Sequence, residues 1–237
     1  MITKRNTILE KSARDLEKSL KIKFKDLGLL ENALIHRSFL NEHRSWKLES
    51  NERLEFLGDA VLELIVTDYL FHNYNNEEGE LTNWRAALVS AESLAPVAEK
   101  IHLEKFLFVG RGEQKNRRSK INILADALEA LIGAIYLDRG TKQSSMFIKK
   151  NIISKLPNIL ENQLFVDAKT ALQEKAQREW KVTPEYIVIQ EGGPDHNKWF
   201  EIGVYINKKL MGKGRGSSKQ KAEKEAAKAA MEKLGAK

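Results

Sequence analysis

The residues best suited to do chemistry are acidic side chains on a predicted helix that begins near residue 51. At about 100° per residue, four acids fall within one narrow stripe of this helix: Glu52, Glu55, Asp59 and Glu63. Phe56, Leu62 and Val66 lie in or beside the stripe, and apolar residues fill most of the other faces. A helix that is apolar nearly all round is expected to be buried, so we expect its acids in a cleft rather than on open surface.

A second predicted helix, 121–137, carries only two charged residues, Asp126 and Glu129. They are three positions apart and therefore share a helix face. Isolated buried carboxylates cost free energy, so proteins neutralise them, pair them with cations or use them to hold metal. Buried ion pairs with arginines such as Arg53 or Arg85 are one interpretation of these acids, and a metal site is the other.

Two helices that both bury acids at helical spacing favour the metal site. Carboxylates that converge across a helix–helix contact make an all-oxygen site suited to Mg²⁺ or Mn²⁺. Such a site can activate water and stabilise negative charge on a phosphodiester. Di-iron bundles also use carboxylates, but they add Glu-x-x-His pairs, and neither helix contains a histidine.

The elements that must position these acids are predicted to be almost entirely helical over 7–157. Apolar residues recur there at three- and four-residue spacing, with turns predicted at 73–79, 109–119 and 138–140. We expect Pro157 to close this region because proline lacks an amide donor. The remainder predicts a small α+β domain: a helix over 169–180, alternating strands from 185 to 214, and a last helix over 217–234 capped by Ser217 or Ser218.

Composition limits the class of protein. The 237 residues contain no cysteine, which excludes disulfides and thiol nucleophiles and fits a reducing compartment. The formal net charge is +7, and residues 167–237 carry 15 Lys and Arg against 10 Asp and Glu, which favours a polyanionic partner for that part. The charged N-terminus is unlike a signal peptide, and no apolar run reaches membrane-spanning length, so we expect a cytoplasmic protein with no membrane partner.

The segment NERLEFLGDAVLEL (51–64) resembles the signature of the ribonuclease III family. The resemblance continues through ALIHRSF (33–39), EEGELT with RAALVS (77–90) and ILADALEALIGAIYLD (123–138). It implies a homodimeric, Mg²⁺-dependent nuclease, in which Mn²⁺ can substitute, with Phe56 inserting into the partner subunit. The residues that it implies for the metal-binding active site are Glu55, Asp59, Asp126 and Glu129, with Glu52 and Glu78 as accessory acids.

Within this implied site, Glu55, Asp126 and Glu129 are expected to be ligands, and Asp59 is expected to position the attacking water or to share a metal-bound water. His36 is expected to be structural. The sequence departs from the family in the loop before the second acidic helix, where Asn116-Arg117-Arg118-Ser119 replaces the common Gly-Gly pair.

Residues 167–237 resemble a double-stranded-RNA-binding domain, through the pieces 167–177, 192–206 and 212–231. Short polar side chains on one helix face suit the shallow minor groove of duplex RNA: Thr170, Gln173 and Gln177. His196 lies in a turn that could enter the next minor groove. Lysines near the start of the last helix suit phosphates, where the helix dipole reinforces them: Lys219, Lys221 and Lys224. Gln220 stands where the family has a second adjacent lysine.

The sequence therefore predicts an all-α catalytic domain (7–157), a linker (158–166) and an α-β-β-β-α double-stranded-RNA-binding domain (167–237). We expect cleavage of double-stranded RNA, such as ribosomal and messenger precursors, by in-line attack of metal-held water. The products would carry 5′-phosphate and 3′-hydroxyl ends with short 3′ overhangs. Two alternatives stay open: a catalytically inactive double-stranded-RNA-binding structural component, and a carboxylate-metal hydrolase for small phosphorylated molecules.

Overall fold

The chain folds as two compact units, Met1–Phe165 and Val166–Lys237. The computed structural model describes residues 2–46, 48–113, 117–161, 168–194 and 198–235. No helix in these ranges is long and apolar enough to cross a membrane. Each unit has a hydrophobic core of its own, as expected for independently packed domains.

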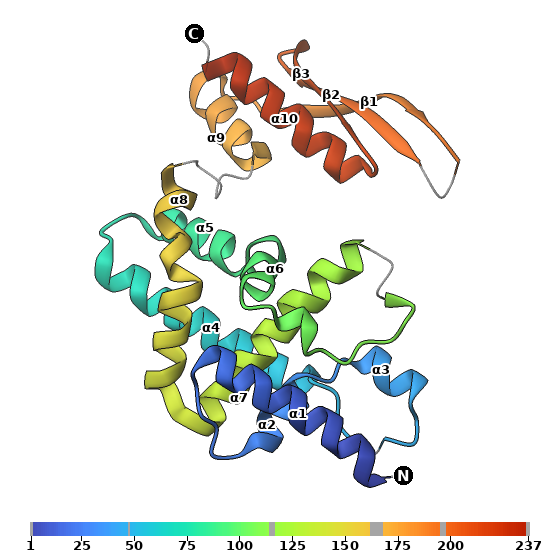
Figure 1. Cartoon of the computed structure of the whole chain (residues 1–237). Helices are drawn as coiled ribbons and strands as arrows, with labels where there is room; N and C mark the ends of the chain where they lie inside the picture. Colours follow the sequence, from blue (N-terminus) through green and yellow to red (C-terminus); the bar gives the residue numbers. More distant parts are fainter. Residues whose placement is uncertain (1, 47, 114–116, 162–167, 195–197, 236–237) are drawn as a thin grey trace. The chain divides into compact units, whose positions relative to one another are not determined.

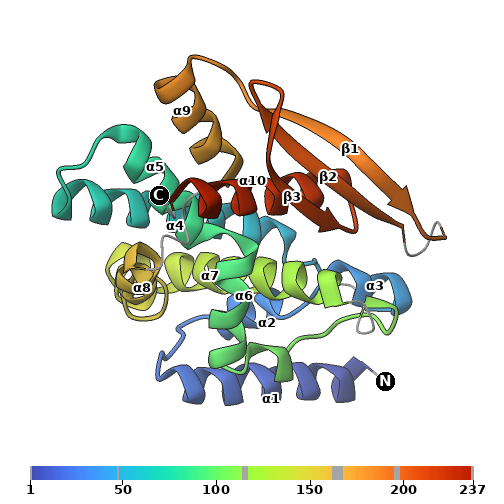
Figure 2. The same cartoon turned by 90° about the horizontal axis from the view of Figure 1, so that it is seen from above.

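The described part of the first unit is built from helices joined by turns and loops, as predicted. Its two longest central elements, α4 and α7, pack against each other, and shorter helices surround them (Figure 1). In the view turned by 90°, α1 lies along the edge of the unit (Figure 2). The helices in chain order are α1 (Ile2–Leu20), α2 (Leu27–Ala33), α3 (Arg37–Glu42), α4 (Glu52–Asn73), α5 (Glu78–Val89), α6 (Ala91–Lys100), the 3-10 turn η1 (Leu103–Lys105), α7 (Arg117–Asn151), η3 (Ile153–Lys155) and α8 (Leu156–Glu161).

The core of this unit is formed largely by the apolar faces of α4 and α7. Leu62 and Val66 of α4 and Leu128 and Leu131 of α7 are fully buried. The turn expected at 138–140 appears as a kink inside α7, where Gly140 adopts φ 74° and ψ −179°, a backbone conformation that side-chain-bearing residues rarely adopt. The predicted helical core is therefore confirmed, and the expected turn separates two helical segments that α7 joins across the kink at Gly140.

The expectation that Pro157 closes the helical region is wrong. Pro157 is the second residue of α8, which runs to Glu161 and so enters the segment expected to be a linker. Proline is tolerated in the first turn of a helix, because the amide hydrogen that it lacks has no partner there. The rest of the expected linker, 162–166, lies outside the described residues.

The second unit has the predicted order α-β-β-β-α. Its elements are α9 (Ala168–Trp180), β1 (Glu185–Gly192), β2 (Trp199–Ile206), β3 (Lys209–Gly216) and α10 (Lys219–Gly235). The strands form an antiparallel sheet in the order β1-β2-β3, and α9 and α10 cover one face of it (Figure 2). Alanines of α10 and Leu172 of α9 form the buried layer with Val204 and Ile206.

Candidate active site

Two glycines allow α4 and α7 to cross at backbone contact. A Cβ atom at Gly58 would overlap the carbonyl oxygen of Glu129, and one at Gly133 would overlap the carbonyl oxygen of Leu54. Any larger residue at either position would force the helices apart. The absence of these side chains therefore brings the acids that flank the crossing close to one another.

Three of the four predicted acids meet beside this crossing. Glu55 of α4 and Asp126 and Glu129 of α7 each offer a carboxylate oxygen, and these three oxygens lie within 4.8 Å of one another. All three residues are partly buried. Asp59 is exposed and is not part of this group, although its charge acts on both Glu55 and Glu129.

The electrostatics of the cluster are unfavourable without a cation. Burial, together with the negative charges of Asp59, Asp126 and Glu55, raises the pKa of Glu129 to about 8. Burial and neighbouring acids raise the pKa of Glu55 to about 6. Burial also raises the pKa of Asp126, against a lowering by His36. Hard divalent cations prefer carboxylate oxygens as ligands, and a bound cation would offset the repulsion between these three acids. The residues therefore fit Mg²⁺ or Mn²⁺.

The two arginines considered as neutralising partners of these acids, Arg53 and Arg85, pair with other residues. Nη1 of Arg53 lies 3.9 Å from Oε2 of Glu49 on the surface. Nη1 of Arg85 donates a hydrogen bond to Oγ1 of Thr67 over 3.1 Å. Both guanidinium groups therefore have partners outside the acid cluster.

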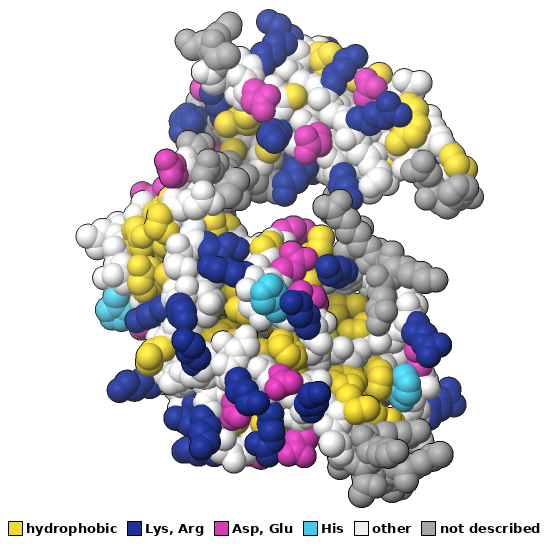
Figure 3. Space-filling view, viewed as in Figure 1, with side chains coloured by type: hydrophobic (Ala, Val, Ile, Leu, Met, Phe, Trp, Pro, Cys, Tyr) yellow, Lys and Arg dark blue, Asp and Glu magenta, His cyan; other side chains and the backbone are white. Residues whose placement is uncertain are grey.

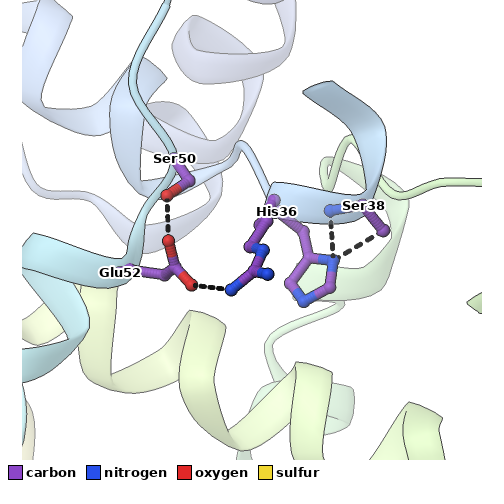
Figure 4. Close-up of polar contacts among 5 residues, drawn as sticks. His36, Ser38, Ser50 and Glu52 are labelled. Atoms are coloured by element: carbon purple, nitrogen blue, oxygen red, sulfur yellow. Dashed lines mark hydrogen bonds and ion pairs between the residues drawn. The ribbon is translucent and has the colours of Figure 1, made fainter. Parts of the chain in front are cut away.

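A pocket of about 400 Å³ opens beside the cluster and is lined in part by Glu52, Glu55 and Asp126. Glu52 is exposed and accepts hydrogen bonds from Ser50 Oγ (2.8 Å) and Arg37 Nη1 (3.3 Å), which lower its pKa (Figure 4). Sequence analysis did not assign five other lining residues to this site: His36, Arg37, Ser38, Asn41 and Glu113.

Four of these five residues could have been found from the sequence, and Glu113 could not. Those from 36 to 41 lie in or directly after the ALIHRSF motif, so their polar types were a usable signal. Glu113 lies in a predicted turn, where an acidic residue is unremarkable, and nothing in the sequence marked it. It accepts a hydrogen bond from Ser119 at the start of α7.

Glu78, the second predicted accessory acid, lies elsewhere in this chain. It is exposed at the start of α5 and lines a different pocket, of about 800 Å³, together with Phe71 and Arg85. Phe71 also belongs to a row of exposed apolar residues along α4. Phe56 is 81% exposed, Leu64 66% and Phe71 72%, and a surface that exposes several large apolar side chains marks an interaction site.

The second unit brings several predicted RNA contacts together. Thr170, Gln173 and Gln177 line one groove of about 550 Å³ with Arg178 and Lys181. Basic side chains are spread over this unit with acidic ones between them (Figure 3). His196 lies outside the described residues.

The predicted lysines fall in the first turns of α10, as expected. Lys219, Lys221 and Lys224 all lie within its first six residues. Ser218, one of the two predicted caps, accepts a hydrogen bond from the backbone N–H of Lys221 over 3.3 Å. Nζ of Lys219 lies 5.8 Å from the ring centre of Phe200, a cation–π contact that sequence analysis did not anticipate.

Comparisons with known proteins agree with both units. Residues 26–156 match the family model described as ribonuclease-III-like, and residues 168–234 match the double-stranded RNA binding motif. The chain is 45% identical to Ribonuclease 3 of Listeria monocytogenes serotype 4a over 222 residues, which cover 93% of this chain and 96% of that protein. It is 48% identical to Ribonuclease 3 of Carboxydothermus hydrogenoformans over 222 residues, covering 92% and 94%.

A solved structure gives the same result for the first unit. The nuclease domain of ribonuclease III from Campylobacter jejuni superposes with a TM-score of 0.53 and 44% identity, covering 60% of this chain and 96% of that one. The helical first unit with its carboxylate cluster, followed by the α-β-β-β-α unit, defines a nuclease of the double-stranded-RNA type. The chain belongs to the ribonuclease III family, and the predictions of this family, its fold class and its enzyme type are confirmed.

Proposed function

We propose that the protein is a metal-dependent endonuclease that cleaves double-stranded RNA. The observation that carries this proposal is the convergence of Glu55, Asp126 and Glu129 at the crossing of α4 and α7. The proposed domains are a nuclease domain, expected over 7–157 and extended by α8 to Glu161, and a double-stranded-RNA-binding domain over 167–237. The acids supply the chemistry, and the second unit selects the substrate.

In this proposal Glu55, Asp126 and Glu129 hold Mg²⁺, with Mn²⁺ as a substitute. The cation, when bound, polarises water and neutralises charge that develops on the phosphate. Asp59 is exposed, and in this proposal it would orient the attacking water and accept its proton. In-line attack at phosphorus would leave 5′-phosphate and 3′-hydroxyl ends. Arg37 holds Glu52 at the pocket edge, which limits the net negative charge that approaching RNA meets.

We further propose that two copies assemble through the exposed face of α4. Phe56 is the anchor, because an aromatic side chain that is 81% exposed gains most from burial in a partner. The Campylobacter jejuni nuclease domain is described as flexible in a region involved in dimer formation. Two copies would present two acid clusters to one duplex, so that each strand is cut once and short 3′ overhangs result.

The second unit would supply most of the affinity for RNA. The groove that contains Thr170, Gln173 and Gln177 presents hydroxyl and amide groups to 2′-hydroxyls in the minor groove. Lys219, Lys221 and Lys224 would contact phosphates. Structured ribosomal and messenger precursors, met in the cytoplasm, are the proposed substrates. A purely structural RNA binder would have no use for an intact acid cluster, and a hydrolase of small phosphorylated molecules would have no use for the second unit.

The proposal is tested by incubating the protein with labelled RNA in Mg²⁺ or EDTA. We expect short duplex products from a long perfect duplex in Mg²⁺ only, and no cleavage of a single strand of the same sequence. Glu129→Gln is the matched control, because it keeps the shape of the side chain and removes its charge; it should bind the duplex and leave it intact. Cleavage by Glu129→Gln within a few-fold of the unaltered protein would refute the assigned site.

A further inference from the structure

Arg37 and Glu52 form an ion pair at the edge of the acid pocket. Nη1 of Arg37 lies 3.3 Å from Oε1 of Glu52. The second carboxylate oxygen of Glu52, Oε2, accepts a hydrogen bond from Oγ of Ser50 over 2.8 Å (Figure 4). Both oxygens of Glu52 are therefore engaged, and Glu52 is not one of the three acids whose oxygens converge at the crossing of α4 and α7. Its contacts are those of an anchor for a guanidinium group.

The backbone ties the two residues together independently of their side chains. The N–H of Asn51, directly before Glu52, donates to the carbonyl oxygen of Ile35, two positions before Arg37, over 2.8 Å. Asn51 and Ile35 are both buried, so this hydrogen bond is shielded from water. The start of α4 and the start of α3 are therefore fixed relative to each other.

The first residues of α3 are fixed a second time, by the segment before α7. His36 is the N-cap residue of α3, and its Nδ1 accepts a hydrogen bond from the N–H of Ser38 over 3.2 Å. The N–H of His36 donates to the carbonyl oxygen of Phe108 over 3.0 Å. Oγ of Ser38 accepts a hydrogen bond from the N–H of Gly110 over 2.9 Å. Both neighbours of Arg37 are thus held in place, and so is the point from which its side chain leaves the backbone.

The guanidinium of Arg37 keeps most of its donors for another partner. It carries five N–H groups in one plane, and its hydrogen bond to Glu52 engages Nη1 only. Within the described part of the chain, Nε and Nη2 of Arg37 form no hydrogen bond, and the side chain is 68% exposed. The guanidinium fork matches two oxygens of a phosphate, so a guanidinium that is anchored at one end can hold a phosphodiester with the other.

The pocket needs a cationic side chain of its own if an RNA strand is to enter it. Arg37 is the one lysine or arginine among the described residues that line it, and four of the others are acidic: Glu52, Glu55, Glu113 and Asp126. These carboxylates repel an approaching phosphodiester. A divalent cation at the cluster would offset this repulsion near Glu55 and Asp126, and Arg37 offsets it at the edge where Glu52 lies.

We propose that Arg37 binds a phosphodiester of the RNA strand that the acid cluster cuts, and that Glu52 is a positioning residue that fixes the guanidinium. This inference rests on the proposed nuclease function and deepens it, because it gives Glu52, expected only as an accessory acid, a role apart from metal binding. An exposed ion pair contributes little to folding stability. Loss of this pair should therefore alter cleavage far more than the melting temperature.

Three variants separate the parts of this arrangement. Arg37→Ala removes the charge and the donors, Arg37→Lys keeps the charge without the planar fork, and Glu52→Gln keeps the shape but removes the anchoring charge. Arg53→Ala is the matched control, because Arg53 follows Glu52 on α4 but pairs with Glu49 and is not among the described residues that line the pocket.

Four quantities are measured for each variant. Cleavage of duplex RNA is followed under single-turnover conditions in Mg²⁺. Duplex affinity is measured across a salt series in a Glu129→Gln background, which should leave the RNA intact. Mn²⁺ binding is measured by calorimetry without RNA, and thermal melts in EDTA show whether each variant is folded.

We expect Arg37→Ala to flatten the slope of log affinity against log salt by about one, because one phosphate contact is lost. Arg37→Lys should keep the slope, and Glu52→Gln should keep it too. Both should cut about 10- to 100-fold more slowly, because a misplaced phosphodiester reacts poorly. The effect of Glu52→Gln on the rate should vanish in an Arg37→Ala background, where no guanidinium is left to position. Mn²⁺ affinity and melting temperature should stay within error of the unaltered protein.

Several results would overturn the inference. Mn²⁺ binding weakened by Glu52→Gln as strongly as by Glu55→Gln would make Glu52 a metal ligand. A rate and a salt slope in Arg37→Ala equal to those of the unaltered protein, or an equal loss in Arg53→Ala, would remove the role of Arg37. If Arg37→Ala does not fold, Arg37→Lys decides, and an unchanged rate in that variant would contradict the role of the fork. In all these cases the unaltered protein still cleaves duplex RNA; absence of that cleavage would instead overturn the proposed function, and this inference with it.

Discussion

Glu129→Gln should make the metal-free protein more stable while it abolishes catalysis. The structure raises the pKa of Glu129 from a usual 4.5 to about 8, chiefly by burial, so the folded protein at neutral pH must bind a proton that the unfolded chain releases. Glutamine has the same shape and needs no proton. The substitution therefore removes a cost of folding that the native protein carries only for its function.

The magnitude follows from the size of the shift. One pKa unit corresponds to about 1.4 kcal/mol, so at pH 7.5 the unscreened cost would be about 4 kcal/mol. Glu129 is only partly buried, and screening by water reduces this to about 1–2 kcal/mol. For a unit of this size, such a gain raises the melting temperature by about 3–6 °C.

The sign of the pH dependence is also fixed. Because the folded pKa is above the unfolded value, the unaltered protein loses stability as the pH rises from about 4.5 to about 8. The difference in the free energy of unfolding between Glu129→Gln and the unaltered protein should be near zero at about pH 4.5 and largest at about pH 8. Glu55 adds to the trend in both proteins, between 4.5 and about 6, and cancels in the comparison.

The assay is a thermal melt of both proteins in EDTA at pH 5 and pH 8, repeated with Mn²⁺. In EDTA we expect Glu129→Gln to melt higher at pH 8 and at nearly the same temperature at pH 5. Mn²⁺ should stabilise only the unaltered protein, because a ligand stabilises the state that binds it. Equal melting temperatures at pH 8 in EDTA, or equal stabilisation of both proteins by Mn²⁺, would refute the reasoning.

Three further predictions concern the dimer, the core and the RNA-binding unit. Phe56→Ala should weaken self-association by about 2 kcal/mol or more, measured by sedimentation equilibrium, whereas Ile8→Ala, at another exposed apolar residue, should not. Asp138 is buried and accepts backbone N–H groups from two residues in the loop before α2, so Asp138→Ala should cost about 2–4 kcal/mol in chemical denaturation with cleavage retained at low temperature. Replacing Lys219 and Lys221 together by Ala should weaken duplex binding and flatten its salt dependence, and an unchanged slope in a salt titration would contradict their role as phosphate contacts.

The helical spacing of acids predicted that the acids of each helix share one face, because residues three and four apart lie on the same side of a helix. The resemblance to the ribonuclease III family then singled out Glu55, Asp126 and Glu129 among them, and it also implied the α-β-β-β-α order of the second unit. Spacing alone does not give the distance between two helices. The backbone contact at Gly58 and Gly133 therefore went unrecognised, and with it the reason why the cluster forms at this crossing.

Other features depend on contacts that no local pattern contains. His36 owes its orientation to Phe108 and Gly110, which are distant in the chain, so the residues around it in the sequence did not indicate its place at the pocket. Pro157 was misjudged because a proline signals both the end of one helix and the first turn of the next. Asp59 shares the stripe of Glu55, but the stripe could not show that only one of these two carboxylates turns toward α7.

The most direct test of the account is to locate Mn²⁺ by anomalous diffraction in crystals of the protein. We predict a peak at coordination distance from the carboxylates of Glu55, Asp126 and Glu129, and no such peak in Glu129→Gln crystals grown and soaked in the same way. A peak confined to another part of the chain, or an unchanged peak in Glu129→Gln, would contradict the claim that these acids hold the metal that cleaves RNA.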